Sequence, residues 1–173
     1  KKSGNNVWAA AIDKEASAYG RDWRTLVLMD RGRWDSTNAA LFPETCRLID
    51  AAGVPAVEAF FAAMKPNTTI KPHSDTCNFV LTSHLGLIIP GQDEAKPPCR
   101  LSVGDQTRAW REGQVSLFDT SILHDAINDS DQSRYILMFR VWHPELTPTE
   151  RKGLQFLFDC LEEPGLVSEH PMD

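Results

Sequence analysis

The tripeptide His73-Ser74-Asp75 is the part of the sequence that most directly indicates chemistry. Residues two apart on an extended chain point to the same face, so this imidazole and this carboxylate can converge on one ion. His124, which lies between two predicted strands, is the natural third ligand. Two histidines and one carboxylate leave three positions of an octahedron open, an arrangement that suits non-haem Fe(II) oxygenases. We therefore predict a metal site at His73, Asp75 and His124, although the same tripeptide is also common in surface turns.

Arg134 is the second informative residue. It follows His124 by ten positions and begins the almost entirely apolar segment Tyr135–Trp142. A buried guanidinium without a partner is costly, and a carboxylate that accepts two hydrogen bonds from it would remove that cost. If the neighbouring strand carries His124, Arg134 would hold the far carboxylate of a metal-bound dicarboxylate. An exposed position at a strand edge, or a salt bridge to Asp129 or Asp131, would also explain this arginine.

Other polar residues near these segments leave several interpretations open. His84 lies within the apolar stretch Phe79–Ile89, where it would be a core residue, a hydrogen-bond donor in a pocket or a rival metal ligand. Asp119 follows a predicted strand and would orient a metal-binding histidine by accepting a hydrogen bond from its ring. Asp119, Ser121 and His124 are also the residue types of a serine hydrolase, but the sequence has no nucleophile elbow.

The middle of the chain contains the elements that must position these residues. Short segments rich in apolar and β-branched residues alternate with turn residues, at the spacing of a β-sandwich or barrel. The predicted strands are Val57–Met64, Thr69–His73, Phe79–Ile89, Arg100–Val103, Thr107–Trp110, Val115–Phe118, Asp125–Asn128 and Tyr135–Trp142. We predict an all-β core of the jelly-roll type with flanking helices and a site inside the barrel mouth.

The flanking segments have a different pattern. We predict a short helix at Val7–Tyr19 and a strand at Trp23–Met29. Within Asn38–Ala52 we predict a helix whose better-defined part is Glu44–Ala52, with Pro43 in its first turn. Thr147-Pro148-Thr149-Glu150 is a capping-box sequence with proline at the first helical position, so a helix should follow it. The chain would then be a single domain, with an N-terminal part at 1–53, a jelly-roll core at 54–143 and a C-terminal helix at 147–163.

Composition limits the classes of function. A chain of 173 residues that is 42% hydrophobic can bury the core of one domain. A net charge of −6 disfavours a nucleic-acid partner, and no apolar run is long enough for stable membrane insertion. The four cysteines form no CxxC pair, so we expect free thiols rather than a zinc ribbon. The first residue is not Met, so the chain is compatible with being part of a longer one, and it leaves the compartment open between the cytoplasm and a lumen.

Several segments, in this order, resemble the aspartyl/asparaginyl β-hydroxylase family. The resemblance extends from about Trp23 to Pro148, and the ordered set is more specific than any one motif. The segments that carry it are Trp23-Arg24 through Gly32-Arg33, Phe42–Cys46, Met64–His73, Ser83–Pro90, Trp110–Gly113, Phe118-Asp119, Leu123-His124 and Trp142–Pro148.

The resemblance implies a double-stranded β-helix that uses Fe(II) with the cosubstrates 2-oxoglutarate and O2. By position, His73 and His124 match the metal-binding histidines of the family. Arg134 matches the arginine that binds the far carboxylate of 2-oxoglutarate, and His84 matches a histidine beside the near carboxylate. Trp23 matches a tryptophan near the pocket.

Three residues depart from the animal members of the family, which act on epidermal-growth-factor-like domains. Those enzymes have glycine at the position of Asp75, arginine at that of Thr82 and serine at that of Ala62. With Asp75 present, the chain looks more like members with a full triad, which include free-proline and lipid-A acyl-chain hydroxylases. An acidic ligand also disfavours halogenation, which generally needs that position vacant.

These observations lead to three functional hypotheses. The first is hydroxylation of the β-carbon of an aspartyl or asparaginyl residue, or of a related amino-acid carbon. The second is hydroxylation of a free small metabolite or a fatty-acyl chain. The third is a jelly-roll binding module without catalysis, which the intact set of His73, Asp75, His124 and Arg134 disfavours.

Overall fold

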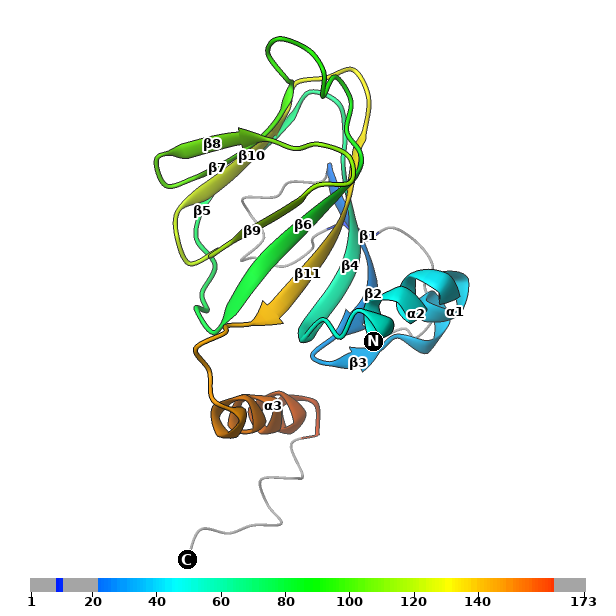
Figure 1. Ribbon diagram of the computed structural model, residues 1–173, viewed down its shortest axis with the longest axis vertical. Helices are drawn as coiled ribbons and strands as arrows, with labels where there is room; N and C mark the ends of the chain where they lie inside the picture. The colour runs from blue at the N-terminus through cyan, green and yellow to red at the C-terminus, as the bar shows by residue number, and fades with distance from the viewer. Residues whose placement is uncertain (1–8, 11–21, 164–173) are drawn as a thin grey trace, which may run out of the picture.

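The computed structural model describes residues 9–10 and 22–163. Two β-sheets face each other, helices α1 and α2 lie beside strands β2 and β4, and α3 lies beyond the end of β11 (Figure 1). In chain order the elements are β1 (Ala9–Ala10), β2 (Trp23–Asp30), β3 (Arg33–Trp34), α1 (Ser36–Leu41), α2 (Pro43–Ala51), β4 (Ala56–Met64), β5 (Thr68–His73), β6 (Val80–Ile88), β7 (Cys99–Val103), β8 (Gln106–Ala109), β9 (Val115–Phe118), β10 (His124–Asn128), β11 (Arg134–Trp142) and α3 (Pro148–Glu162). Among these helices, none has the length and apolar character needed to cross a bilayer.

The strand order is that of a jelly roll. The larger sheet runs β1-β2-β4-β11-β6-β9, with β3 paired to β2, and the smaller sheet runs β5-β10-β7-β8. From β4 onward the chain passes back and forth between the sheets, so that β4, β6, β9 and β11 lie in one and β5, β7, β8 and β10 in the other. Eight antiparallel strands connected in this way form two Greek keys. The predicted fold class is confirmed.

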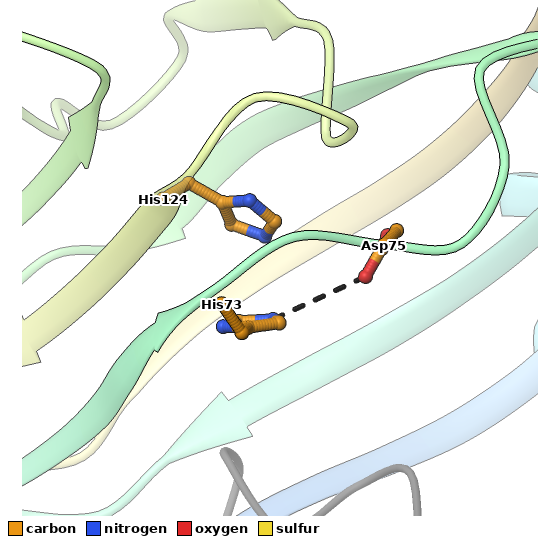
Figure 2. A group of neighbouring side chains, drawn as sticks. All are labelled: His73, Asp75 and His124. Atoms are coloured by element: carbon orange, nitrogen blue, oxygen red, sulfur yellow. Dashed lines mark ion pairs between the residues drawn. The ribbon is translucent and has the colours of Figure 1, made fainter.

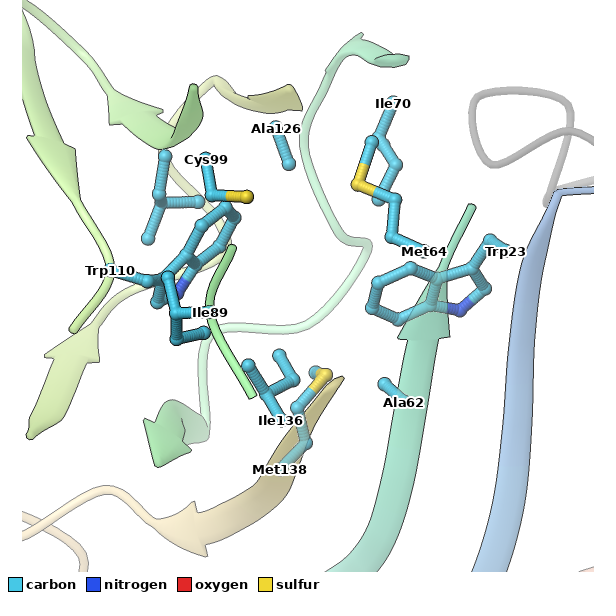
Figure 3. Close-up of a cluster of buried hydrophobic side chains, with 11 residues drawn as sticks. Trp23, Ala62, Met64, Ile70, Ile89, Cys99, Trp110, Ala126, Ile136 and Met138 are labelled. Atoms are coloured by element: carbon cyan, nitrogen blue, oxygen red, sulfur yellow. The ribbon is translucent and has the colours of Figure 1, made fainter. Parts of the chain in front are cut away.

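Alternation along the strands gives the larger sheet two apolar faces. On β11, Ile136 and Met138 point between the sheets and join the inner core with Trp110 and Ile89 (Figure 3). Leu137 points the other way and packs with Ile49 of α2 in a second core. Because side chains two apart share a face, the row of β11 that begins at Arg134 also includes Arg140. The strand that builds the core therefore also brings two arginines to the interior.

The helical predictions for the N-terminal part need correction in part. The better-defined helix predicted at Glu44–Ala52, with Pro43 in its first turn, is confirmed as α2. The residues before it form the separate helix α1, because Pro43 has no backbone N–H to donate and Phe42 adopts non-helical angles, with φ −130° and ψ 53°. The helix predicted at Val7–Tyr19 is wrong at Ala9–Ala10, which form β1 against β2. The remainder of that segment lies outside the described residues.

The C-terminal helix begins as predicted. Thr147 and Glu150 form a complete capping box, with Pro148 in the first turn. Gln155 donates a hydrogen bond to the carbonyl of Arg31, which ties α3 to the turn after β2. The expectation of free thiols is also confirmed for Cys46, Cys77, Cys99 and Cys160.

Gly86 offers a test of the packing between β6 and the segment that connects β8 to β9. A Cβ at this position would lie 2.2 Å from the carbonyl oxygen of Arg111, which is backbone and cannot move aside cheaply. We expect Gly86→Ala to lower the free energy of unfolding by about 1–3 kcal/mol, measured by urea denaturation. Gly153→Ala is the matched control, since a Cβ there meets nothing within 4 Å and α3 should gain about 0.5–1 kcal/mol. Equal stability of the Gly86 variant and the wild type would contradict this packing.

Candidate metal centre

The side chains of His73, Asp75 and His124 converge in space. His73 is the last residue of β5, His124 is the first residue of β10, and the two are partners in the antiparallel register. Their ring centroids lie 4.3 Å apart, and Oδ1 of Asp75 lies 4.0 Å from Nε2 of His73 (Figure 2). One potential ligand atom from each residue falls within 4.8 Å of the others. The structure thus brings together the three residues that the sequence singled out.

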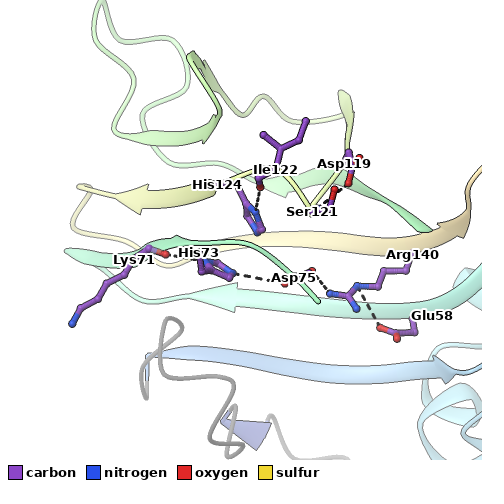
Figure 4. Close-up of polar contacts among 9 residues, drawn as sticks. All are labelled: Glu58, Lys71, His73, Asp75, Asp119, Ser121, Ile122, His124 and Arg140. Carbon is purple, nitrogen blue, oxygen red and sulfur yellow. Dashed lines mark hydrogen bonds and ion pairs between the residues drawn. The ribbon is translucent and has the colours of Figure 1, made fainter. Parts of the chain in front are cut away.

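Backbone carbonyls fix the orientation of both imidazoles. Nδ1 of His73 lies 2.8 Å from the carbonyl oxygen of Lys71, and Nδ1 of His124 lies 2.9 Å from that of Ile122 (Figure 4). A carbonyl oxygen can only accept, so each Nδ1 carries the proton and each Nε2 keeps its lone pair. Histidines that bind metals are held in this way, and the donor set fits a divalent ion such as Fe(II).

Asp75 reaches the site by a different route from the one predicted. It lies beyond the end of β5 and not on the strand, so two-residue alternation does not explain its direction. Its backbone N–H donates to the carbonyl of Thr120 over 2.8 Å. A guanidinium N–H of Arg140 donates to Oδ2 of its carboxylate. A backbone bond and a charged partner therefore hold Asp75.

His124 is suited to bind a cation in its neutral form. Burial lowers the pKa of His124, because the imidazolium would lose its hydration inside the barrel. The hydrogen bond to Ile122 opposes this shift, and the nearby His73 adds to it. His124 is also the first residue of β10 and does not lie in the loop before it, which corrects its predicted place between strands.

Arg134 is buried without a hydrogen-bond partner in the described part of the chain. Its exposure is 0%, and Nε and both terminal nitrogens make no hydrogen bond there. The guanidinium carbon lies 4.2 Å from the ring centroid of Trp110 and 5.4 Å from that of Trp23. Burial lowers the pKa of Arg134 to about 10, so the group remains charged at neutral pH. The alternatives of an exposed arginine or a salt bridge to Asp129 or Asp131 are wrong.

The same pocket contains further buried polar groups that lack partners among the described residues. These are Oγ1 of Thr82, Nε2 of His84 and Oγ1 of Thr120. They line one pocket together with the three candidate ligands and Arg134. It holds about 400 Å³ of space not filled by protein atoms, its open mouth included. Several unpartnered donors around one pocket indicate a polar, anionic ligand.

His84 is a pocket donor and not a rival ligand. Its Nδ1 accepts a hydrogen bond of 3.3 Å from the indole N–H of Trp110, so a neutral ring carries its proton on Nε2. Burial, and then the charge of Arg134, lower the pKa of His84 well below 6.5. The neutral ring therefore presents an N–H in the pocket.

Sequence reasoning missed some contributors. Arg140 was not singled out, although alternation along its strand from Arg134 would have indicated an inward side chain. Thr120 gave no signal, because it lies in a loop whose course the sequence does not reveal. Asp119 does not support a ligand histidine as predicted, since its carboxylate accepts from the backbone N–H of Ser121 instead.

The buried state of His84 predicts a pH dependence of stability. In the unfolded chain its pKa is about 6.5, whereas in the folded chain it is lower, so below this pH only the unfolded state gains the proton. This group should reduce the free energy of unfolding by about 1.4 kcal/mol per pH unit as the pH falls below 6.5, and have no effect above it. We expect the pH slope of His84→Gln, measured by denaturant titration, to be shallower by about one proton. Identical slopes for variant and wild type would contradict this.

Comparison with known proteins shows the family to which the sequence is similar. Residues 2–144 match the aspartyl/asparaginyl beta-hydroxylase family. The mouse aspartyl/asparaginyl beta-hydroxylase is 35% identical over 137 residues, which cover 77% of this chain and 18% of that protein. The human aspartate beta-hydroxylase domain-containing protein 2 is 31% identical over 153 residues, which cover 84% of this chain and 40% of that protein.

Among solved structures, a cupin 2 conserved barrel domain protein from Salinispora arenicola aligns at 15% identity with a TM-score of 0.43, over 70% of this chain and 76% of that chain. The chain spans less than half the length of the two curated relatives named above. Because the family match covers most of its residues, the chain belongs to the aspartyl/asparaginyl beta-hydroxylase family.

Proposed function

We propose that this chain is an Fe(II)- and 2-oxoglutarate-dependent dioxygenase that hydroxylates an unactivated C–H bond. Membership of a hydroxylase family supports the general class. The observation that carries the specific proposal is the guanidinium of Arg134, buried without a hydrogen-bond partner in the described residues and lining the same pocket as the candidate metal ligands.

The metal would be held by His73, Asp75 and His124. Two neutral imidazoles and one carboxylate suit Fe(II) and leave positions open for other ligands. When bound, iron together with 2-oxoglutarate and O2 supplies the oxidising power for C–H hydroxylation. The chain's own contribution is to fix the three ligands, through the carbonyls of Lys71 and Ile122 and through Arg140.

The cosubstrate would be held by Arg134. A guanidinium donates two parallel hydrogen bonds to a carboxylate, and 2-oxoglutarate has a carboxylate at each end. Trp110 and Trp23 lie over the guanidinium and hold it in place. Thr82, His84 and Thr120 offer further hydrogen-bonding groups in the same pocket, which would be available to the remaining oxygens of the ligand.

The favoured substrate is the β-carbon of an aspartyl or asparaginyl residue, or of a related amino acid, because the relatives are named for that reaction. A free metabolite or fatty-acyl chain is the second candidate. Asp75 favours it, since the sequence in this respect resembles the full-triad members that act on such substrates. A screen of aspartyl and asparaginyl peptides against free amino acids and acyl chains, with succinate release as the readout, would separate the two.

The role of His124 can be tested by substitution. We expect His124→Ala to abolish iron-dependent formation of succinate from 2-oxoglutarate, because one of only two imidazole ligands is removed. His143→Ala is the control, since His143 does not line the pocket. Succinate would be measured by mass spectrometry on purified protein with and without added Fe(II). Turnover equal to that of the wild type would remove His124 from the site.

The role of Arg134 can be tested through the KM for 2-oxoglutarate and through stability. Arg134→Met should raise the KM for 2-oxoglutarate by roughly 30-fold or more, since loss of one partner of a buried charge pair costs about 2–5 kcal/mol. Without 2-oxoglutarate the variant should be at least as stable as the wild type, because it removes a buried charge. Arg100→Met is the control, since Arg100 pairs with Asp129 outside the pocket. An unaltered KM would refute the anchoring role.

A further inference from the structure

We propose that Arg140 is a positioning residue that presents one oxygen of Asp75 to the metal and keeps the other oxygen occupied. Glu58 holds Arg140 in place from the opposite side. This inference rests on the metal site of the proposed function, and it concerns how the acidic ligand of that site is held.

The two oxygens of Asp75 lie in different surroundings. Oδ2 accepts a hydrogen bond from a terminal nitrogen of Arg140, whereas Oδ1 faces the imidazole of His73 at 4.0 Å (Figure 4). The side chain of Asp75 is 13% exposed and that of Arg140 is 23% exposed, so water competes only weakly for this bond. A carboxylate held in this way can offer one oxygen to an ion.

Arg140 is itself fixed by its place in the larger sheet. It is the cross-strand partner of Glu58 on β4 and of Thr82 on β6. Its Nε lies 3.8 Å from Oε2 of Glu58. Burial raises the pKa of Glu58, and the charge of Arg140 opposes that shift. The guanidinium thus lies between two carboxylates, one on its own sheet and one after β5 of the other sheet.

Asp75 needs such a partner more than the histidines do. His73 and His124 lie on paired strands, with their rings bonded to nearby carbonyls. Asp75 lies beyond the strand, and its backbone bond to Thr120 does not restrict rotation of the carboxylate. If Oδ2 were free, the carboxylate could turn away or bind the ion with both oxygens and fill a position that the chemistry needs open. Groups that hydrogen-bond a ligating carboxylate typically contribute 10- to 100-fold to metal affinity or activity.

The experiment measures Mn²⁺ binding, which needs neither substrate nor turnover. Binding is followed by the loss of the free Mn²⁺ signal in electron paramagnetic resonance, in the absence of 2-oxoglutarate. We expect Arg140→Gln to weaken binding by about 10- to 100-fold. Arg140→Lys should recover part of this loss, because a single ammonium keeps the charge but not the fork that reaches both carboxylates. Arg100→Gln makes the same change of charge outside the pocket and should bind like the wild type.

A double-mutant cycle separates positioning from a general effect on folding. In the Asp75→Asn background, Arg140→Gln should no longer alter Mn²⁺ affinity, because the carboxylate through which it acts is gone. The visible spectrum of bound Co²⁺ should change in Arg140→Gln and stay unchanged in Arg100→Gln, since it reports the ligand geometry. Glu58→Gln should weaken Mn²⁺ binding in the same direction but by less.

The outcomes are distinct. Unchanged Mn²⁺ affinity in Arg140→Gln would overturn the proposal. Tighter binding would also overturn it, and would show that Arg140 withholds Asp75 from the ion and leaves two histidines as ligands. An equal loss in the Asp75→Asn background would show that Arg140 acts on the fold and not through Asp75. If the wild type itself bound no Mn²⁺, Co²⁺ or Fe²⁺, the proposed function would fail instead.

Discussion

The interior of this barrel is arranged around a fully buried positive charge. Arg134 is fully buried, and its nitrogens find no hydrogen-bond acceptor in the described residues, which is a state that proteins ordinarily avoid. Two indole rings give the guanidinium weak attraction to their faces, but this does not replace an anion. The apolar core must therefore offset this cost whenever no anion is bound. A dicarboxylate would supply the acceptor that the guanidinium lacks among the described residues. Its binding would therefore be favourable and would stabilise the fold.

A single strand connects this charge to the candidate metal site. The inward row of β11 runs from Arg134 through Ile136 and Met138 to Arg140, so one arginine begins the strand and the other lies two residues before its end. Between them, apolar side chains close the barrel and keep the local dielectric low, which strengthens each electrostatic contact around the pocket. The smaller sheet supplies the two histidines from paired strands. The jelly roll thus brings the buried cation, the candidate metal ligands and an apolar wall into one pocket.

Much of this arrangement could be predicted from the sequence, because it depends on strands, and strands impose a period of two. That period and the turn residues indicated the jelly roll, and an arginine in an apolar strand indicated a buried anion site. What could not be predicted depends on the course of loops and on tertiary pairing. Asp75 is directed by Thr120 and Arg140, which are distant in sequence, and no spacing rule reveals such a contact. The strand β1 could also not be predicted, because its pairing with β2 overrides the local helical preference of Ala9–Ala10.

The position of Arg140 also gives a physical reason for one departure from the animal enzymes. By resemblance, those enzymes have arginine at the position of Thr82 and glycine at that of Asp75. In this fold Thr82 is the cross-strand partner of Arg140 on the inner face. An arginine at position 82 would place two guanidinium groups side by side, and like charges directly opposite each other destabilise a sheet. A small neutral residue at 82 is therefore compatible with Arg140, and Arg140 has Asp75 as its acidic partner. Asp75, Arg140 and Thr82 therefore form one group of neighbouring side chains, so a change of charge at any of them alters the electrostatic surroundings of the other two.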